Sequence, residues 1–200
     1  MSIRAVAFDV GGVLTQVGHL HDVRERWQVR LRMTAAELST ALASVDPDEL
    51  AFTGLLTETQ YKARLAAALG QSIAQAGEFM ADMCGELDAE LFAYLASLRP
   101  RYATAILSDA ISGARREYQT RYRFEQLVDV IIYSCEVGLA KPDPRVYRLL
   151  CDRLAVSPGE LVFLDDRPEN VKGACELGIH ALLHETTVQS IRALEALLAA

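Results

Sequence analysis

Four short polar clusters in this sequence carry the side chains best suited to chemistry. Each comes after a short apolar run, and three of the four contain carboxylates. In chain order they hold Asp9, Gly11 and Gly12; Ser108 and Asp109; Lys141; and Asp165, Asp166 and Asn170. Carboxylates that converge without compensation repel one another. A hard cation such as Mg²⁺ removes that repulsion, because it binds carboxylate oxygens, waters and phosphate oxygens.

A lysine and a hydroxyl near such carboxylates point to phosphoryl chemistry. Lys141 would add a positive charge and Ser108 a hydrogen-bond donor. Together with a metal ion they would make a seat for a phosphoryl group and leave one carboxylate free to attack it, which gives an aspartyl-phosphate. The clusters therefore predict phosphoryl transfer, provided that the fold brings them together.

The elements that must do so are short apolar runs alternating with helical segments. The runs of four to six residues lie at 3–8, 103–107, 128–133, 161–164 and 180–183. Most are continuously apolar, as expected for strands buried on both faces of a parallel sheet. Helical spacing follows at 112–122, 143–154, 168–178 and 187–199. This alternation predicts an α/β fold with a doubly wound, mostly parallel, Rossmann-like sheet.

The segment 16–88 breaks this rhythm, because it contains no convincing strand and several signals for helices. Thr34 and Thr57 each begin a capping-box pattern. Pro47 stands at a predicted first position of a helix, and Gly70 is predicted to end the helix before it. We therefore expect a series of helices in this segment.

A crossover between parallel strands needs only about a dozen residues, so the segment is much longer than the sheet requires. We predict an inserted α-helical cap at residues 16–88 and a Rossmann-like core made of residues 1–15 and 89–200. In open α/β sheets, ligands bind beyond the carboxyl ends of the strands. The four polar clusters are therefore expected to face one crevice there.

The composition excludes several classes of protein. The chain has 200 residues and a net charge of −7, which does not suit bulk nucleic-acid binding or an anionic membrane surface. Its apolar runs are far shorter than the ~18 residues of a membrane span. We see no signal peptide, and the four cysteines have no metal-ligand or C-x-x-C spacing. These features predict a cytoplasmic protein with buried free thiols and a small-molecule partner, and they leave the oligomeric state open.

The order of the four clusters resembles that of the haloacid dehalogenase superfamily. The motifs read F-D-x-G-G-V-L, I-L-S, K-P-D-P-x-x-Y and F-L-D-D-x-x-x-N. The resemblance covers the whole chain, and the helical insert is similar to the type-1 cap of that family. It implies a hydrolase that binds Mg²⁺ and a phosphorylated small molecule.

The resemblance also implies roles on the phosphate side of the site. Asp9 corresponds to the nucleophile, Ser108 to the hydroxyl that hydrogen-bonds the phosphate, and Lys141 to the lysine that neutralises both nucleophile and phosphate. Gly12 and Asp109 are expected beside the phosphate as well, the glycine because it permits a tight turn and a close approach of the backbone.

On the metal side, the resemblance implies ligands from two of the clusters. Asp9 and Asp166 correspond to acidic ligands, and the backbone carbonyl of Gly11 to a third. Asp165 corresponds to a supporting acid or a ligand that acts through water. Asn170 holds the supporting position four residues beyond Asp166.

Two positions depart from the family pattern. The second Asp of the first motif, which protonates the leaving group and then activates water, is Gly11 here. Loss of such a group typically costs about 10²–10⁴-fold in rate, and least for leaving groups that need little protonation, such as anomeric sugar phosphates and acyl phosphates. Many relatives have Asn where this chain has Asp109. That acid would repel a phosphate unless a nearby arginine pairs with it, and the candidates are Arg115, Arg116 and Arg167.

The leading hypothesis is a Mg²⁺-dependent phosphatase that hydrolyses a small phosphorylated metabolite through an aspartyl-phosphate on Asp9. A 2-haloacid dehalogenase is the second hypothesis, since those relatives also lack the second Asp. They use no metal, however, and the Asp165-Asp166 pair would repel a carboxylate substrate. The third hypothesis is a catalytically weak or non-catalytic binding protein, which Gly11 and Asp109 would favour.

Overall fold

The core of the molecule is a five-stranded parallel sheet. The computed structural model describes residues 2–199, with the side chains of residues 17–20 outside that description. The strands lie in the order β3-β2-β1-β4-β5, and all neighbouring pairs are parallel. Their bounds are β1 Ala5–Phe8, β2 Ala103–Ser108, β3 Val130–Tyr133, β4 Leu161–Asp165 and β5 His180–Leu183. The predicted α/β fold with a parallel sheet is confirmed.

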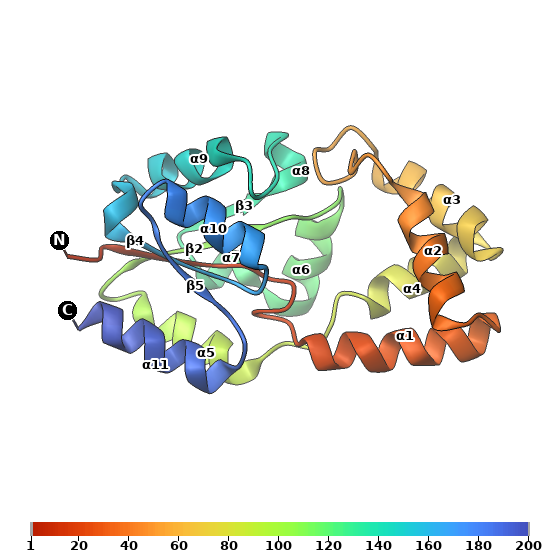
Figure 1. Ribbon diagram of the computed structural model, residues 1–200, viewed down its shortest axis with the longest axis horizontal. Coiled ribbons are helices and arrows are strands. Elements are labelled where there is room, and N and C mark those ends of the chain that lie inside the picture. The colour runs from red at the N-terminus through yellow and green to blue at the C-terminus, as the bar shows by residue number, and fades with distance from the viewer. Residues whose placement is uncertain (1, 200) are drawn as a thin grey trace.

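Helices cover both faces of this sheet, because successive side chains of a buried strand point to opposite sides. Val6 and Phe8 pack on one face, mainly against α5 and α11, whereas Ala5 and Ala7 pack on the other, mainly against α9 and α10 (Figure 1). The helices of the core are α5 Ala89–Leu98, α6 Ala114–Tyr122, α7 Phe124–Leu127, α8 Ser134–Val137, α9 Pro144–Leu154, α10 Pro168–Glu176 and α11 Thr187–Leu198. The sheet is therefore the middle layer of three.

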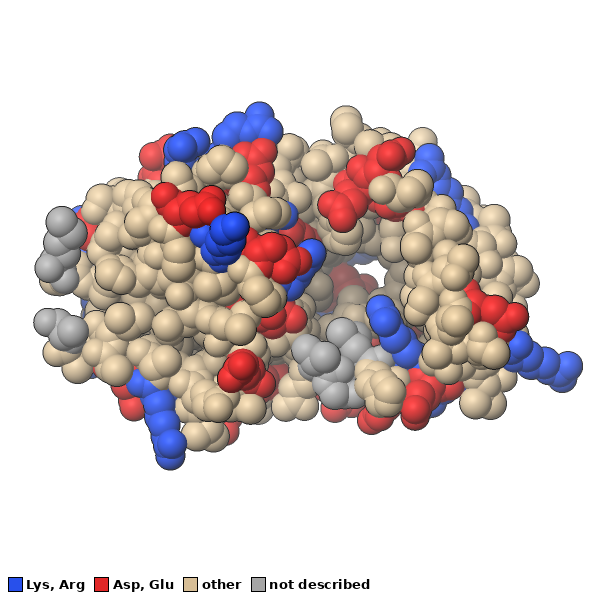
Figure 2. Space-filling model, viewed as in Figure 1, with Lys and Arg blue, Asp and Glu red and all other residues tan. Residues whose placement is uncertain are grey.

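Between β1 and β2 the chain forms an inserted group of helices with its own apolar cluster, which we call the cap. Its helices are α1 Val17–Leu31, α2 Ala35–Val45, α3 Glu58–Leu69 and α4 Ile73–Asp82. Trp27, Leu38, Leu65 and Phe79 are buried together there, separately from the two clusters on the sheet. The helical insertion is confirmed. Figure 1 shows it beside the sheet, and Figure 2 shows a surface hollowed between the two parts.

Local sequence signals correctly predicted several helix ends within the cap. Thr34 and Thr57 form the predicted capping boxes, and Gly70 ends α3 in a left-handed conformation. The prediction for Pro47 is wrong, because the residue lies in a turn and begins no helix. The carboxylate of Asp46 accepts hydrogen bonds from the backbone N–H groups of Leu50 and Ala51, and this organises the segment as a loop.

The two connections between cap and core run side by side. Thr15 forms a bridge with Leu87, and Asp88 stabilises the start of α5 by accepting the N–H of Leu91. A second contact lies in the loop before α3. There Gly54 has a φ of 75°, and a Cβ on it would lie 2.2 Å from the carbonyl oxygen of Cys135 in the core. The close approach of these two backbones requires a glycine.

Two further predictions concern the whole chain. Within residues 2–199, no helix has the length and apolar character needed to cross a membrane. The four cysteines are unpaired, as expected, but the prediction that they are buried holds only for Cys151. Cys84 and Cys135 are half-buried, and Cys175 is exposed at the end of α10.

Candidate active site

The polar clusters converge because their strands end at one edge of the sheet. Asp9 directly follows β1, which lies between β2 and β4. Ser108 is the last residue of β2, and Asp165 is the last residue of β4. The chain leaves β1 toward β2 on one side and later returns to β4 on the other, so the order of strands reverses beside β1. This is the place where open α/β sheets bind ligands.

Lys141 lies at the centre of the site and contacts residues from three strands or strand ends. Its side chain is 1% exposed, and its Nζ lies 2.9 Å from Oδ1 of Asp9 and 2.7 Å from Oδ2 of Asp165. It also donates to the carbonyl oxygen of Leu107 at 3.3 Å. The backbone N–H of Lys141 donates to Oδ1 of Asp109 at 3.0 Å. One ammonium group therefore links β1, β2 and β4.

Asp165 is held from several sides. It is fully buried, and besides Lys141 it accepts hydrogen bonds from the amide of the Asn170 side chain at 3.0 and 3.1 Å and from the N–H of Arg167 at 2.9 Å. These bonds fix the carboxylate that in turn holds Lys141. The side-chain oxygen of Asn170, Oδ1, is buried without a hydrogen-bond partner among the described residues.

Negative charge exceeds positive charge in this cluster. Oxygens of Asp9, Asp165 and Asp166 all lie within 4.8 Å of one another, and Asp109 adds a fourth carboxyl beside Lys141. Burial raises the pKa of Asp9 to about 7, a rise that Lys141 opposes and Asp165 reinforces. Burial and the charge of Asp165 also raise the pKa of Asp166.

The pKa of Lys141 reflects the same excess of negative charge. Burial by itself would lower that pKa, but the surrounding carboxylates of Asp9, Asp165 and Asp109 raise it to about 12. The lysine is therefore charged at every physiological pH, and a single positive charge does not neutralise its neighbours. A site with this imbalance attracts a further cation.

The glycines of the first cluster have different environments. Gly12 has a φ of 79°, and a Cβ on it would lie 2.1 Å from Oδ2 of Asp166. Only glycine therefore lets Asp166 approach this turn. Gly11 is exposed, and a Cβ there would meet no atom within 4 Å. The absence of an acid at Gly11 is consequently not imposed by lack of space.

Ser108 and Asp109 lie at the mouth of the same cluster. Ser108 is 2% exposed, and within the described part of the chain its hydroxyl has no hydrogen-bond partner. The three arginines considered as candidate partners of Asp109 all pair with glutamates instead. Arg115 pairs with Glu125 and Glu136, Arg116 with Glu58 and Arg167 with Glu169. Asp109 is held by the Lys141 backbone instead, and burial raises its pKa.

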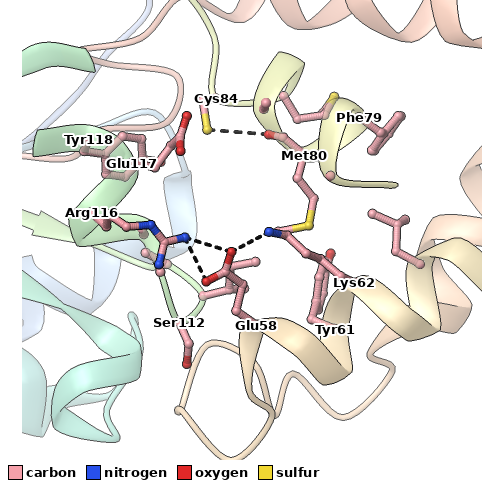
Figure 3. A pocket seen from close by; sticks show the side chains of 18 of the residues that line it. Glu58, Tyr61, Lys62, Phe79, Met80, Cys84, Ser112, Arg116, Glu117 and Tyr118 are labelled. Carbon is pink, nitrogen blue, oxygen red and sulfur yellow. Dashed lines mark hydrogen bonds and ion pairs between the residues drawn. The ribbon is translucent and has the colours of Figure 1, made fainter. Parts of the chain in front are cut away.

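A cavity that no sequence motif predicts opens beside this cluster. About 470 Å³ in volume, it extends from Asp109 and Ala110 to the inner face of the cap. Figure 3 shows α3, α4 and α6 around it, with Glu58 bonded to both Lys62 and Arg116. Glu58 and Arg116 are far apart in the chain, so no motif joins them. Only the i, i+4 spacing of Glu58 and Lys62 could have signalled part of this cluster.

The chain is similar to several curated proteins. It is 28% identical to acyl-CoA dehydrogenase family member 10 of Mus musculus over 98% of its own length, although it spans only 19% of the length of that protein. It is 26% identical to phosphatase MT3486 of Mycobacterium tuberculosis, over 95% of this chain and 91% of the relative. It is 29% identical to (S)-2-haloacid dehalogenase 1 of Pseudomonas, over 90% and 83%.

Solved structures share its fold over nearly the whole chain. A predicted HAD-like hydrolase of Porphyromonas gingivalis has a TM-score of 0.82 at 25% identity, with complete coverage of both chains. A HAD family enzyme of Bacteroides thetaiotaomicron, solved with magnesium and inorganic phosphate, has a TM-score of 0.75 at 20% identity over 93% and 96%. The haloacid dehalogenase-like hydrolase family matches residues 3–178. The chain therefore belongs to the haloacid dehalogenase-like hydrolases.

Proposed function

We propose that this hydrolase is a Mg²⁺-dependent phosphatase that cleaves a small phosphorylated metabolite through an aspartyl-phosphate on Asp9. The observation that carries the proposal is the buried Lys141 ammonium, 2.9 Å from Asp9 and 2.7 Å from Asp165 in a cluster that retains excess negative charge. A buried carboxylate beside a fixed cation is suited to nucleophilic attack on phosphorus. The similarity to a mycobacterial phosphatase supports the same reaction class.

The residues present fit a magnesium ion. The converging oxygens of Asp9 and Asp166 supply hard ligands, and Gly12 leaves room for Asp166 in the turn. The buried, unpartnered Oδ1 of Asn170 is a polar atom that a metal-bound water would satisfy. We propose Asp9, Asp166 and the carbonyl of Gly11 as ligands. When bound, the ion acts as a Lewis acid that withdraws charge from the phosphoryl oxygens.

Asp165 is engaged differently from the other two acids. Its oxygens already accept hydrogen bonds from Lys141, Asn170 and the Arg167 backbone. We therefore assign Asp165 and Asn170 to the positioning of Lys141, with contact of Asp165 to the metal through water.

The proposed reaction has two steps. An Oδ atom of Asp9 attacks phosphorus, an Oδ–P bond forms, and the bond from phosphorus to the leaving oxygen breaks. Lys141 and the free hydroxyl of Ser108 hold the phosphoryl oxygens as charge develops on them. Water then attacks the aspartyl-phosphate, which releases inorganic phosphate and regenerates Asp9. Gly12 and Asp109 line the phosphate seat.

The missing acid at Gly11 restricts the leaving group. No carboxyl stands at that position to donate a proton, so the departing oxygen must leave as an anion or take its proton from water. Substrates with weakly basic leaving oxygens are favoured. We propose the division into a core of residues 1–15 and 89–200 and a cap of residues 16–88, with the cap excluding bulk water from this step.

A 2-haloacid dehalogenase remains the second candidate, because the chain is 29% identical to such an enzyme over 90% of its length. Attack of Asp9 on a carbon would displace halide, which needs no proton, so Gly11 is compatible with it. The Asp165-Asp166 pair argues against it, since it would repel the carboxylate of a haloacid.

Hydrolysis of p-nitrophenyl phosphate tests the proposal directly. Rates are compared with Mg²⁺ and with EDTA for the wild type and Asp9→Asn. Asp152→Asn, at an exposed site on α9, is the matched control. We expect Mg²⁺-dependent turnover in the wild type and the control that is lost in Asp9→Asn. A folded protein with turnover below about 10⁻³ s⁻¹ contradicts the proposal, because typical enzymes run at about 1–10³ s⁻¹. Chloride release from 2-chloropropionate would then favour the second candidate.

A further inference from the structure

The cavity between the cap and the core begins beside the residues proposed to hold the phosphoryl group, Ser108 and Lys141. Asp109 and Ala110, which follow Ser108, form part of its wall, and much of the remainder comes from α3, α4 and α6 (Figure 3). Its volume of about 470 Å³ lies in the range of sites that enclose a small organic molecule. A phosphate monoester bound at Ser108 and Lys141 would place its alcohol portion in this space.

The wall of this cavity is mainly apolar. Its apolar side chains include Phe52, Leu65, Phe79, Met80, Ile111 and Tyr118. Met80 and Ile111 are half-buried, so both retain surface that a ligand could cover. Covering apolar surface of this kind stabilises a complex in proportion to the area removed from water. Methionine adapts its shape to different apolar ligands.

Most charged groups on the wall are already paired with one another. Lys62 lies 2.6 Å from Oε1 of Glu58, and Arg116 donates to both oxygens of Glu58 at 3.0 Å. Gly113, at the start of α6, makes room for this carboxylate, since a Cβ there would lie 2.2 Å from Oε2 of Glu58. Glu117 pairs with Arg121.

Two charged groups of the wall remain outside these pairs. Arg24 is exposed to solvent, and Asp109 accepts the backbone N–H of Lys141. The interior of the cavity therefore offers few charged partners for a second ionic group of a substrate. Its walls instead match an uncharged hydrocarbon.

We propose that the substrate is the phosphate monoester of a predominantly apolar alcohol or phenol without a second charged group. This inference rests on the phosphatase function proposed above and names the substrate class of that site. The phosphate occupies the cluster around Lys141, and the hydrocarbon occupies the cavity against Met80 and Ile111. An aromatic alcohol also suits Gly11, because a phenolate departs with little need of a proton.

A series of para-alkylphenyl phosphates tests the inference, because lengthening the alkyl group changes the phenol's acidity little while it adds apolar area. The ratio kcat/KM is measured with Mg²⁺ from methyl to hexyl. We expect an increase of about fourfold for each CH₂ that is buried, equivalent to ~0.8 kcal/mol, until the cavity is filled. A flat or falling series overturns the substrate class, whereas the turnover itself keeps the phosphatase proposal.

A binding measurement separates the two proposals further. The same para-alkylphenyl groups are presented as phosphonates, which are not hydrolysed, and Kd is measured by calorimetry with Mg²⁺. A Kd that falls with alkyl length supports the apolar site even if no phosphate ester turns over, an outcome that overturns the phosphatase proposal alone. A Kd independent of alkyl length overturns the inference.

Variants locate the effect in the cavity. Met80→Gln on α4 should reduce the gain in kcat/KM for each added CH₂ to below twofold. Ile73→Gln on the same helix is the control, because Ile73 is 59% exposed to solvent and lies outside the cavity wall. Phe52→Ser, in the loop before α3, is a second test should Met80→Gln fail to fold. An unchanged chain-length dependence in a folded Met80→Gln or Phe52→Ser overturns the inference.

Discussion

Two clusters of paired acids and bases lie near the space between cap and core, and they differ in burial and in charge balance. In the sheet-edge cluster, Lys141 stands between Asp9 and Asp165 with a side chain that is 1% exposed. In the cavity cluster, Glu58 stands between Lys62 and Arg116, and the Arg116 side chain is 66% exposed. The first has more carboxylates than its single cation can neutralise, whereas in the second both cations bond to one shared carboxylate.

The pKa values of the central acids move in opposite directions as a result. Burial raises the pKa of Asp9 to about 7, against the pull of Lys141. Burial also acts on Glu58, but hydrogen bonds from Lys62 and Arg116 outweigh it and hold the pKa of that carboxyl below its usual range. Exposure and charge balance, rather than the mere presence of an ion pair, therefore decide whether a cluster is strained. We expect the sheet-edge cluster to control chemistry and the cavity cluster to be replaceable.

Replacing Lys141 should produce the largest effect. Lys141→Met leaves Asp9 and Asp165 buried without their cation, and we expect phosphatase rates to fall at least ~10²–10³-fold. We also expect the free energy of unfolding to fall by about 3 kcal/mol, as is typical when one partner of a buried pair is removed. Initial rates and urea unfolding measure these effects.

Lys62→Met is the matched control for Lys141→Met, since Lys62 is a cation of the cavity cluster and its side chain is 29% exposed. It should change the rate less than threefold. Lys141→Arg should not restore activity, because a planar guanidinium does not replace a compact ammonium in so closed a site. Equal losses in the two Lys→Met variants would remove the distinction between the clusters.

Asp166→Asn should mainly weaken the response to magnesium. The loss of a ligand oxygen is expected to raise the Mg²⁺ concentration for half-maximal activity at least tenfold, since even partners outside the ligand set contribute about 10–100-fold in affinity. Titration of p-nitrophenyl phosphatase activity with Mg²⁺ measures this shift. Glu58→Gln is the control and should leave the midpoint unchanged. A wild-type midpoint in Asp166→Asn would exclude Asp166 as a ligand.

The stability of the metal-free protein should depend on pH through Asp9. Its pKa is 3.8 when unperturbed and about 7 in the folded protein, so between these values the folded state keeps a proton that the unfolded state has released. The free energy of unfolding therefore falls as pH rises through this window. Asp9→Asn should reduce the fall and raise Tm at pH 8 by about 3 °C or more. Calorimetry in EDTA checks this, and parallel pH profiles for wild type and variant would refute it.

Replacing Arg116, the exposed cation of the cavity cluster, should give the smallest effect. Arg116→Ala removes an ion pair between the cap and the core, but surface pairs contribute only about 0–1 kcal/mol. We expect a change in Tm of less than about 3 °C and less than threefold change in the rate on p-nitrophenyl phosphate. Salt should abolish even this difference, since it screens exposed charges. A rate loss as large as that of Lys141→Met would show that the cap contact is part of the chemistry.

Several features of the fold were predictable because their causes are local. The capping boxes at Thr34 and Thr57 need only residues three positions apart, and Gly70 ends its helix by its own backbone freedom. The apolar runs predicted the strands, and parallel strands end at a common edge, so Asp9 and Asp165 could be expected near each other. The order of the four motifs along the chain also pointed to the family, because each motif is a short run of neighbouring residues.

Other features depended on contacts that no short pattern encodes. Pro47 follows Asp46, whose carboxylate accepts hydrogen bonds from the amides of Leu50 and Ala51. These bonds organise the segment as a loop and not as a helix. The arginines predicted to neutralise Asp109 found glutamate partners, and the backbone of Lys141 took their place. The contact of the cap residue Glu58 with Arg116 of the core joins positions far apart in the chain, so no local pattern predicts it.

The parallel α/β sheet, the helical insertion and the order in which acidic and basic residues reach the sheet edge all follow from the amino-acid sequence. Local hydrogen bonding and apolar periodicity are enough for these. Three features depend instead on how the cap and the core pack: which charges are buried, which acids contact Lys141 and which residues line the cavity beside Asp109. The energy of a charge depends on its solvent exposure and on groups distant in the chain, and neither is known until the cap and the core have packed.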